Sequence, residues 1–190
     1  MVTSVALYLA FLAALYGERL VELVISHRNA RRALERGGVE SGRGHYPVMV
    51  TVHALFPLAC AAEVVMLHRR VPGALGFVAL ALALAAQGMR WWVVATLGER
   101  WCTRIVVVPG SEPVTRGPYR FLRHPNYAAV LVEAVSVPLI HGAWLSALVF
   151  FAANAALLAV RIPAEERALG ATWTDAIARH RQPAPGAHRA

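Results

Sequence analysis

The hydrophobic positions of this chain fall into five long runs separated by short polar and basic connections. The runs cover about residues 2–25, 47–67, 72–97, 127–140 and 143–160. Most are long enough, or nearly so, to cross a bilayer, because a spanning helix needs about 20 residues. The run at 127–140 is short, and with Pro138 and His141-Gly142 after it the pattern predicts a helical hairpin with a tight turn. We therefore predict an all-α integral membrane bundle of about five transmembrane helices.

A different pattern follows the last run. Pro163 predicts a bend or a restart of the helix, and residues 164–181 place Leu169, Trp173 and Ile177 at three- to four-residue spacing among charges. This spacing predicts a C-terminal amphipathic helix lying on the membrane or on a neighbouring loop. We expect a single domain over residues 1–181 and a disordered, proline-rich tail over 182–190.

Composition supports the membrane interpretation and narrows the possible partners. Hydrophobic residues make up 57% of the 190 positions, and the net charge is +8. All 19 basic residues are arginines, and they lie mainly beside the apolar runs, which suits anionic lipid headgroups better than nucleic acid. The two cysteines, Cys60 and Cys102, have no metal-ligand spacing, so neither a metal site nor a redox function is expected.

The distribution of the arginines predicts the orientation. Five follow the first run, five follow the third, and five lie in the C-terminal tail, whereas only Arg69 and Arg70 follow the second run and none follows the fourth. The positive-inside rule then places the N-terminus outside and the C-terminus in the cytoplasm. The first run is too long for a signal peptide and lacks a cleavage site, so we expect it to be retained.

The loop before residue 127 is the first candidate for chemistry. Residues 116–127 hold two prolines, a glycine and several basic side chains, so they cannot form a spanning helix. Pro125 is suited to the first turn of a helix, whose unpaired amides would then lie beside Arg123 and His124. Such a site fits a carboxylate or another acceptor-rich ligand. An ordinary basic loop at the membrane surface is an equally good interpretation.

A second candidate follows the fifth run. Arg161 and Glu165 are four residues apart, so on a helix they share one face at the cytoplasmic end. A surface ion pair of little energetic value is the alternative interpretation.

Polar residues inside the runs recur at one depth. Glu18, His53, Arg90, Glu133 and Asn154 each fall roughly 10 Å below the cytoplasmic surface at 1.5 Å per residue, one on each run. Glu18 and Glu22 would repel each other, so we expect Arg19 or Arg90 beside them. Two interpretations remain open: a substrate pocket, and pairs that hold the bundle together. Glu63 lies outside this layer, near Arg69 and Arg70, and we expect it at the interface.

The sequence also resembles a known family. Gly117-Pro118-Tyr119, the run from Arg123 to Tyr127, a helical hairpin, and then Arg161 with Glu165-Glu166 are similar to the C-terminal signature of the isoprenylcysteine carboxyl methyltransferase family. The likeness covers about residues 100–170. Residues 16–60 resemble more narrowly the bacterial members that accompany type III polyketide synthases and O-methylate alkylpyrones or alkylresorcinols.

The resemblance implies S-adenosylmethionine as methyl donor, S-adenosylhomocysteine as product and residues 98–170 as the cofactor-binding catalytic core. It assigns the cofactor to Ser111, Glu112, Pro113, Val114, Tyr119, His124, Pro125, Asn126, Tyr127 and Glu165. It assigns Arg161 to the acceptor and makes Arg161 and Glu165 the catalytic pair. Glu18, His53, Arg90 and Glu133 are further candidates for the substrate site. The chain contains no glycine-rich nucleotide turn, in agreement with a donor bound without a Rossmann domain.

The chemistry leaves the acceptor open. An acidic enol or a carboxylate needs no strong base, whereas a phenol would benefit from one, for which His124, Glu133 and His53 are the candidates. The main hypothesis is a bacterial inner-membrane O-methyltransferase with its active site on the cytoplasmic side, acting on a lipophilic hydroxyl or enol among membrane lipids. A carboxyl methyltransferase of prenylcysteine-like substrates and a phospholipid N-methyltransferase are alternatives. A small transporter or a structural membrane protein is the alternative outside enzymes.

Overall fold

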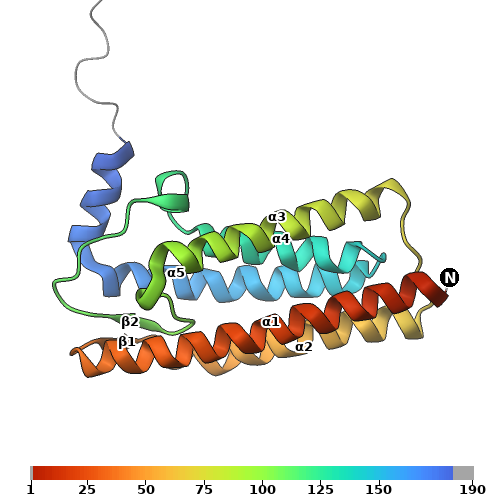
Figure 1. Ribbon diagram of the computed structural model, residues 1–190, viewed down its shortest axis with the longest axis horizontal. Helices are drawn as coiled ribbons and strands as arrows, with labels where there is room; N and C mark the ends of the chain where they lie inside the picture. The colour runs from red at the N-terminus through yellow and green to blue at the C-terminus, as the bar shows by residue number, and fades with distance from the viewer. Residues whose placement is uncertain (1, 182–190) are drawn as a thin grey trace, which may run out of the picture.

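The computed structural model describes residues 2–181. The expected disordered tail, residues 182–190, lies outside the described residues. Residues 2–181 fold into five α-helices and two short 3-10 helices. The α-helices are α1 (Val2–Glu35), α2 (Tyr46–Met66), α3 (Ala74–Leu97), α4 (Pro125–Leu139) and α5 (Trp144–Arg181), and the 3-10 helices are η1 (Gly98–Arg100) and η2 (Gly117–Arg120). The long helices lie side by side along the long axis of the molecule (Figure 1). The prediction of an all-α bundle is confirmed.

Three helical stretches among residues 2–181 are long and apolar enough to cross a membrane: Tyr46–Met66, Ala74–Arg100 and Trp144–Ala171. The five helices match the five predicted runs, and length and composition support a crossing for these three. Helix α4 has only 15 residues, as the short fourth run predicted. Helix α1 has 34 residues, but charged side chains enter it from Glu18 onward.

A small antiparallel sheet was not predicted. Strands β1 (Val39–Ser41) and β2 (Ile105–Val107) pair with Val39 opposite Val107. Three residues are too few to produce a recognisable alternation, so this pairing leaves little trace in the sequence. The sheet lies at the end of the bundle away from the N-terminus, beside the last turns of α1 (Figure 1). It ties the α1–α2 connection to the long connection between α3 and α4.

Helix α4 begins at Pro125, as predicted, and the hairpin with α5 closes through His141 and Gly142. The start of α5 is held by a side chain from another helix. The Glu63 carboxylate on α2 accepts hydrogen bonds from the Leu145 amide (3.2 Å) and from the amide and hydroxyl of Ser146 (both 2.7 Å). Arg69 pairs with the same carboxylate at 3.1 Å. Glu63 therefore lies at the end of the bundle beside Arg69, as expected, and it is buried there.

The bend in α5 lies at Gly170. Pro163 was predicted to bend or restart the helix, and this prediction is wrong: the chain stays helical through Pro163 and leaves helical geometry at Gly170, with φ 73° and ψ −175°. A glycine adopts a positive φ without the steric cost that a Cβ imposes. Beyond this residue the last part of α5 turns away from the bundle axis (Figure 1).

The C-terminal segment packs on the loop before α4. Trp173 is buried, with its ring 5.5 Å from that of His124 and the Arg123 guanidinium 4.9 Å above it. Of the two positions expected for this amphipathic segment, the structure therefore shows contact with the loop. The side chain of Ile177 lies outside the described side chains.

Candidate functional site

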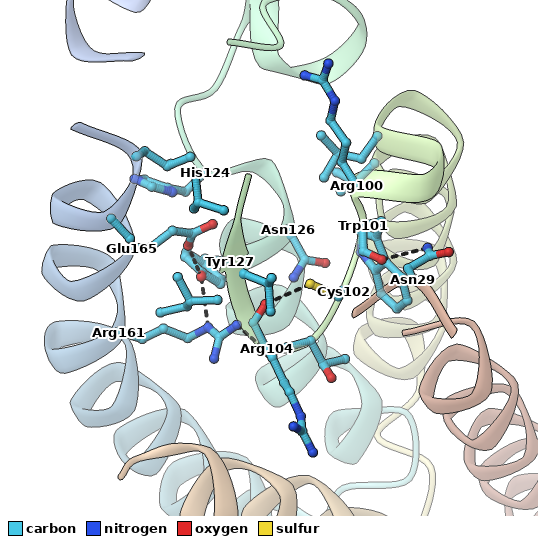
Figure 2. Close-up of a pocket in the computed structure, with 18 of the residues that line it drawn as sticks. Asn29, Arg100, Trp101, Cys102, Arg104, His124, Asn126, Tyr127, Arg161 and Glu165 are labelled. Carbon is cyan, nitrogen blue, oxygen red and sulfur yellow. Dashed lines mark hydrogen bonds between the residues drawn. The ribbon is translucent and has the colours of Figure 1, made fainter. Parts of the chain in front are cut away.

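One large cavity occupies the end of the bundle that carries the small sheet. Its volume is about 690 Å³, which is within the usual range of small-molecule sites. Its wall combines α1 and α2 on one side, the loop after α3, the start of α4 and the inner face of α5 (Figure 2). Segments from the whole length of the chain therefore meet at this one place.

The loop after α3 is fixed by side chains of α1. The Asn29 side-chain amide donates to the carbonyl oxygens of Gly98 (3.1 Å) and Trp101 (2.8 Å). The Ser26 hydroxyl accepts the Thr103 amide at 2.8 Å. Trp101 itself is buried. These bonds satisfy loop backbone groups that the sheet and helices leave unpaired, so the loop is an ordered part of the wall.

Helix η2 is pressed against α3. Gly117 has φ +60°, and a Cβ built there would lie 2.4 Å from the Thr96 hydroxyl, so only glycine fits. Tyr119 follows and lines the cavity. Burial, together with the negative charge of Glu165, raises the pKa of the Tyr119 phenol, so this group is a neutral hydrogen-bonding partner at physiological pH.

The start of α4 carries a cluster of aromatic and charged side chains. His124 Nε2 lies 3.0 Å from a Glu166 carboxylate oxygen, and its ring stacks on Tyr127 at 5.3 Å. The prediction of unpaired amides at this helix start is wrong for two residues. The amides of Tyr127 and Ala128 donate to the His124 carbonyl at 3.1 and 3.2 Å. A different unpaired group lies beside the cavity: the side-chain oxygen of Asn126 is buried and has no hydrogen-bond partner among the described residues.

Arg161 and Glu165 share one face of α5, as predicted, and meet at the hydroxyl of Tyr127. Arg161 Nε donates to this hydroxyl at 2.9 Å, and the hydroxyl donates to a carboxylate oxygen of Glu165 (Figure 2). Arg161 Nη2 also donates to the Thr103 carbonyl at 2.5 Å. Arg161 is buried, so Arg161 and Glu165 do not form the exposed surface ion pair of little energetic value that was the alternative interpretation.

The surroundings of His45 and Cys102, which both line the cavity, favour their neutral forms. Burial and the positive charge of Arg161 lower the pKa of His45. Burial raises the pKa of the Cys102 thiol, whose sulfur donates to the Arg104 carbonyl at 3.0 Å. A protonated thiol is a poor nucleophile.

The polar layer inside the helices consists largely of ion pairs. Arg19 contacts Glu22 at 2.7 Å and Glu133 at 2.9 Å, and Arg90 contacts the same two carboxylates at 2.5 and 3.7 Å. The expected position of Arg19 and Arg90 beside the α1 carboxylates is confirmed for Glu22. Glu18 instead accepts hydrogen bonds from Gln87 and Trp91. The network joins α1, α3 and α4.

The structure divides the substrate candidates into two groups. Arg161, His53 and Arg90 line the large cavity, whereas Glu18 and Glu133 do not. Glu133 lines only a small adjoining cavity of about 30 Å³. Glu18 and Glu133 therefore serve to hold the helices together. Arg161, His53 and Arg90 remain candidates for the substrate pocket.

The residues that the resemblance assigned to the cofactor all lie on the wall of the large cavity. They are Ser111, Glu112, Pro113, Val114, Tyr119, His124, Pro125, Asn126, Tyr127 and Glu165. Thr103 was not predicted as part of the site. Its backbone carbonyl holds Arg161, and its hydroxyl contacts both Ser26 (2.8 Å) and Tyr46 (3.1 Å). Only tertiary structure brings these four residues together, so no local signal reveals them.

Comparison with known proteins identifies the family of this chain. The model of the isoprenylcysteine carboxyl methyltransferase family matches residues 79–171, which include the loop, α4 and most of α5. The uncharacterized protein YpbQ of Bacillus subtilis is 39% identical over 158 residues, which cover 83% of this chain and 94% of that protein. An uncharacterized protein of Haemophilus influenzae is 26% identical over 158 residues, covering 83% and 91% of the two chains. With helices that can cross a membrane and a signature matched around its cavity, the chain belongs to the isoprenylcysteine carboxyl methyltransferase family.

Proposed function

We propose that this protein is a membrane O-methyltransferase that uses S-adenosylmethionine and acts on a lipophilic hydroxyl or enol. The observation that carries the proposal is the shared cavity: residues expected at the methyl donor and the catalytic pair Arg161 and Glu165 line one space of about 690 Å³. Methyltransferases of this family use S-adenosylmethionine. A common cavity is what a transfer between two bound molecules requires, because the reacting atoms must be held in line.

The groups around the loop fit the donor. S-adenosylmethionine carries an amine, hydroxyls and an adenine amino group, all of which need acceptors. The buried Asn126 oxygen has no hydrogen-bond partner within residues 2–181, and the carboxylates of Glu165 and Glu166 lie at the same end of the helical bundle. The positive end of the α4 dipole and the neighbouring Arg123 guanidinium would attract the donor's carboxylate. When bound, the donor supplies an electrophilic methyl group on a cationic sulfur.

The opposite side of the cavity fits an apolar acceptor. Its wall includes Tyr16, Leu20 and Leu23 of α1 and Met49 and Val50 of α2. Leu20 is 50% exposed, so the apolar wall continues onto the outer surface of α1. An acceptor tail would lie along these side chains, with its polar ring toward Arg161. Residues 16–60 resemble the members that methylate alkylpyrones or alkylresorcinols, and this supports an acceptor of that class.

Arg161 is placed to stabilise the oxygen that attacks. Its guanidinium is fixed by Tyr127 and the Thr103 carbonyl, so a positive charge is held in position before the acceptor arrives. An acceptor oxygen beside it is favoured as an anion, and a preorganised cation of this kind costs no rearrangement during the reaction. Glu165 acts through Tyr127 on the same guanidinium and also reaches toward the donor end.

We also propose that the cavity faces the cytoplasm of a bacterial cell, with the N-terminus outside. The arginine-rich connections after α1 and α3 lie at the cavity end of the bundle (Figure 1). The positive-inside rule places such an end in the cytoplasm, where S-adenosylmethionine is made.

The experiment that tests the function is calorimetric binding of S-adenosylhomocysteine to the protein purified in detergent. We expect micromolar binding by the wild type and at least a tenfold weaker constant for Glu165→Ala, because a charge-assisted hydrogen bond contributes about 1.5–3 kcal/mol. Glu35→Ala, on the exposed end of α1, is the matched control and should bind as the wild type does.

Absence of binding by folded wild-type protein would remove the methyltransferase proposal and favour a transporter or structural role. If binding is present, labelled donor with alkylpyrone, alkylresorcinol, prenylcysteine and phospholipid acceptors identifies the class. A methyl group found only on a carboxylate or an amine would contradict the hydroxyl acceptor.

A further inference from the structure

His53 and Asn154 lie where two cavities meet. Each residue lines both the large cavity and the small adjoining one of about 30 Å³. His53 is on α2 and Asn154 is on α5, so the two side chains approach this junction from different helices. Apart from Glu165, the predicted donor residues lie in the loop and at the start of α4, so we assign the junction to the acceptor part of the space.

The bonding of His53 defines its tautomer. Nδ1 lies 2.8 Å from the Met49 carbonyl oxygen, one turn earlier in α2. A carbonyl oxygen only accepts, so Nδ1 carries the proton and Nε2 of the neutral ring presents a lone pair. This contact also fixes the ring orientation. The arrangement matches that of a histidine base whose second nitrogen is held by a carbonyl.

Asn154 is oriented in the same way. Its Nδ2 donates to the Phe150 carbonyl, again one turn earlier, at 2.8 Å. This bond uses one N–H and leaves the side-chain oxygen and the second N–H for the cavity. Asn154 is buried, so these groups face the cavity junction. Together the two residues offer an acceptor for the O–H of a hydroxyl group and a donor for one of its lone pairs.

The other candidate bases are already engaged or covered. His124 Nε2 contacts Glu166, and Glu133 is paired with Arg19 and Arg90. His45 also lines the large cavity, but its Nε2 is buried without exposed surface. Among the described histidines that line the large cavity, His53 alone also lines the small adjoining cavity, where Asn154 lies.

We propose that His53 is the general base for a neutral hydroxyl acceptor and that Asn154 positions this hydroxyl; the proposal rests on the methyltransferase function above. The acceptor O–H bond breaks and its proton moves to His53 Nε2. The oxygen forms the O–CH₃ bond while the sulfur–methyl bond of S-adenosylmethionine breaks, and the electron pair of that bond stays on sulfur. The products are the methyl ether, neutral S-adenosylhomocysteine and an imidazolium that later loses its proton to water.

Three arginines lie around the site of this step. Arg19, Arg90 and Arg161 are the charged groups that act on this imidazole. Arg19 and Arg90 are balanced by Glu22 and Glu133, whereas Arg161 contacts a phenol and a carbonyl oxygen. Negative charge that develops on the acceptor oxygen is therefore stabilised chiefly from the side of Arg161.

The test compares two acceptors with the same alkyl chain, an alkylresorcinol and an alkylated hydroxypyrone. The pyrone enol is ionised at neutral pH and needs no base, whereas a phenol has a pKa of about 10. In His53→Gln we expect kcat for the resorcinol to fall by about 100-fold or more, and kcat for the pyrone to change by less than about threefold. The residual resorcinol rate should rise with pH, as phenolate forms in solution. His27→Gln, on the exposed face of α1, is the matched control.

A second variant and a second measurement separate the base from a merely structural residue. Asn154→Ala should raise KM for both acceptors by about tenfold, the value of one hydrogen bond, with kcat nearly unchanged. With S-adenosylhomocysteine present, titration of the resorcinol into wild-type protein labelled with ¹⁵N-histidine should shift the His53 ring nitrogen signals, and this shift should be absent in His53→Gln.

Failure of this inference differs from failure of the proposed function. Wild-type protein that binds no S-adenosylhomocysteine removes both. Normal donor binding with equal resorcinol rates in the wild type and His53→Gln overturns the base assignment alone. A wild type that methylates the pyrone but never the resorcinol also overturns it, since no neutral hydroxyl is then activated.

Discussion

Tyr127 is where the candidate catalytic residues converge. The sequence predicted Arg161 and Glu165 from a four-residue spacing on one helix, and spacing of this kind is enough to put two side chains on one face. It could not predict that both would meet the same phenol, because Tyr127 is 34 residues before Arg161 and on another helix. The resemblance had assigned Tyr127 to the donor and not to the catalytic pair. Residue types were thus predictable here, and their contacts were not.

The phenol hydroxyl should therefore matter for turnover. In Tyr127→Phe the ring still stacks on His124, but Arg161 and Glu165 lose the group that joins them. We expect kcat to fall by about tenfold to 100-fold, since hydrogen bonds to charged groups contribute about 1.5–3 kcal/mol. Binding of S-adenosylhomocysteine should change much less, and steady-state kinetics with calorimetry measures both quantities.

Tyr8→Phe provides the matched control. The Tyr8 hydroxyl donates to the Val137 carbonyl at 3.1 Å within the hydrophobic core. Its removal should lower the melting temperature without changing kcat. An equal loss of kcat in both variants would mean that Tyr127 acts only through stability.

At the scale of elements, the start of α5 depends on a residue from α2. The position before Trp144 is Ala143, which has no side-chain acceptor for the helix amides. Glu63 supplies that acceptor from across the bundle. A negative group at a helix N-terminus also interacts favourably with the helix dipole.

Replacing Glu63 should reveal this cap. In Glu63→Ala two amides and a hydroxyl lose their acceptor and Arg69 loses its partner, so we expect a loss of about 1–3 kcal/mol of stability. Thermal unfolding in detergent measures it. Binding of S-adenosylhomocysteine should be unchanged, because Glu63 does not line the cavity. A melting temperature equal to that of the wild type would contradict the capping role.

The elements themselves were predictable to different degrees. Long apolar runs determine the helices, and Pro125 determines where α4 begins, because a first-turn proline is a strong local signal. The break in α5 was expected at Pro163 and occurs at Gly170. A proline inside a long helix can be accommodated by a local adjustment, whereas the positive φ at Gly170 ends the helical geometry. Trp173, three residues after this bend, contacts the loop before α4, and the local sequence does not reveal a tertiary contact of this kind.

At the scale of the whole molecule, the depth of polar residues was informative but incomplete. Counting residues along each run predicted a layer, and the structure contains ion pairs among Arg19, Glu22, Arg90 and Glu133. Depth alone cannot tell which polar groups face each other and which face a cavity, because this depends on the rotation of each helix. For this reason Glu18 and Glu133 were candidates for the substrate site, although neither lines the large cavity.

Orientation in the membrane is the property of the whole molecule that is most directly testable. The cavity and the arginine-rich connections share one end of the bundle, so the donor must reach that end. We expect a C-terminal green fluorescent protein fusion to fluoresce and a C-terminal alkaline phosphatase fusion to be inactive, as for a cytoplasmic C-terminus. The opposite pair of results would place the cavity on the outer side, away from S-adenosylmethionine, and contradict the proposed topology.

Asn154, Arg161 and Glu165 recur on one face of α5, seven and then four residues apart. At 1.5 Å per residue, the first and last are about 16 Å apart along the helix axis. The spacing of these residues along α5 therefore determines how far below the membrane surface an acceptor hydroxyl must lie. Because the hydroxyl is selected by its depth, acceptors with tails of different length should be methylated equally well. Moving the hydroxyl to another ring position should change the rate of methylation.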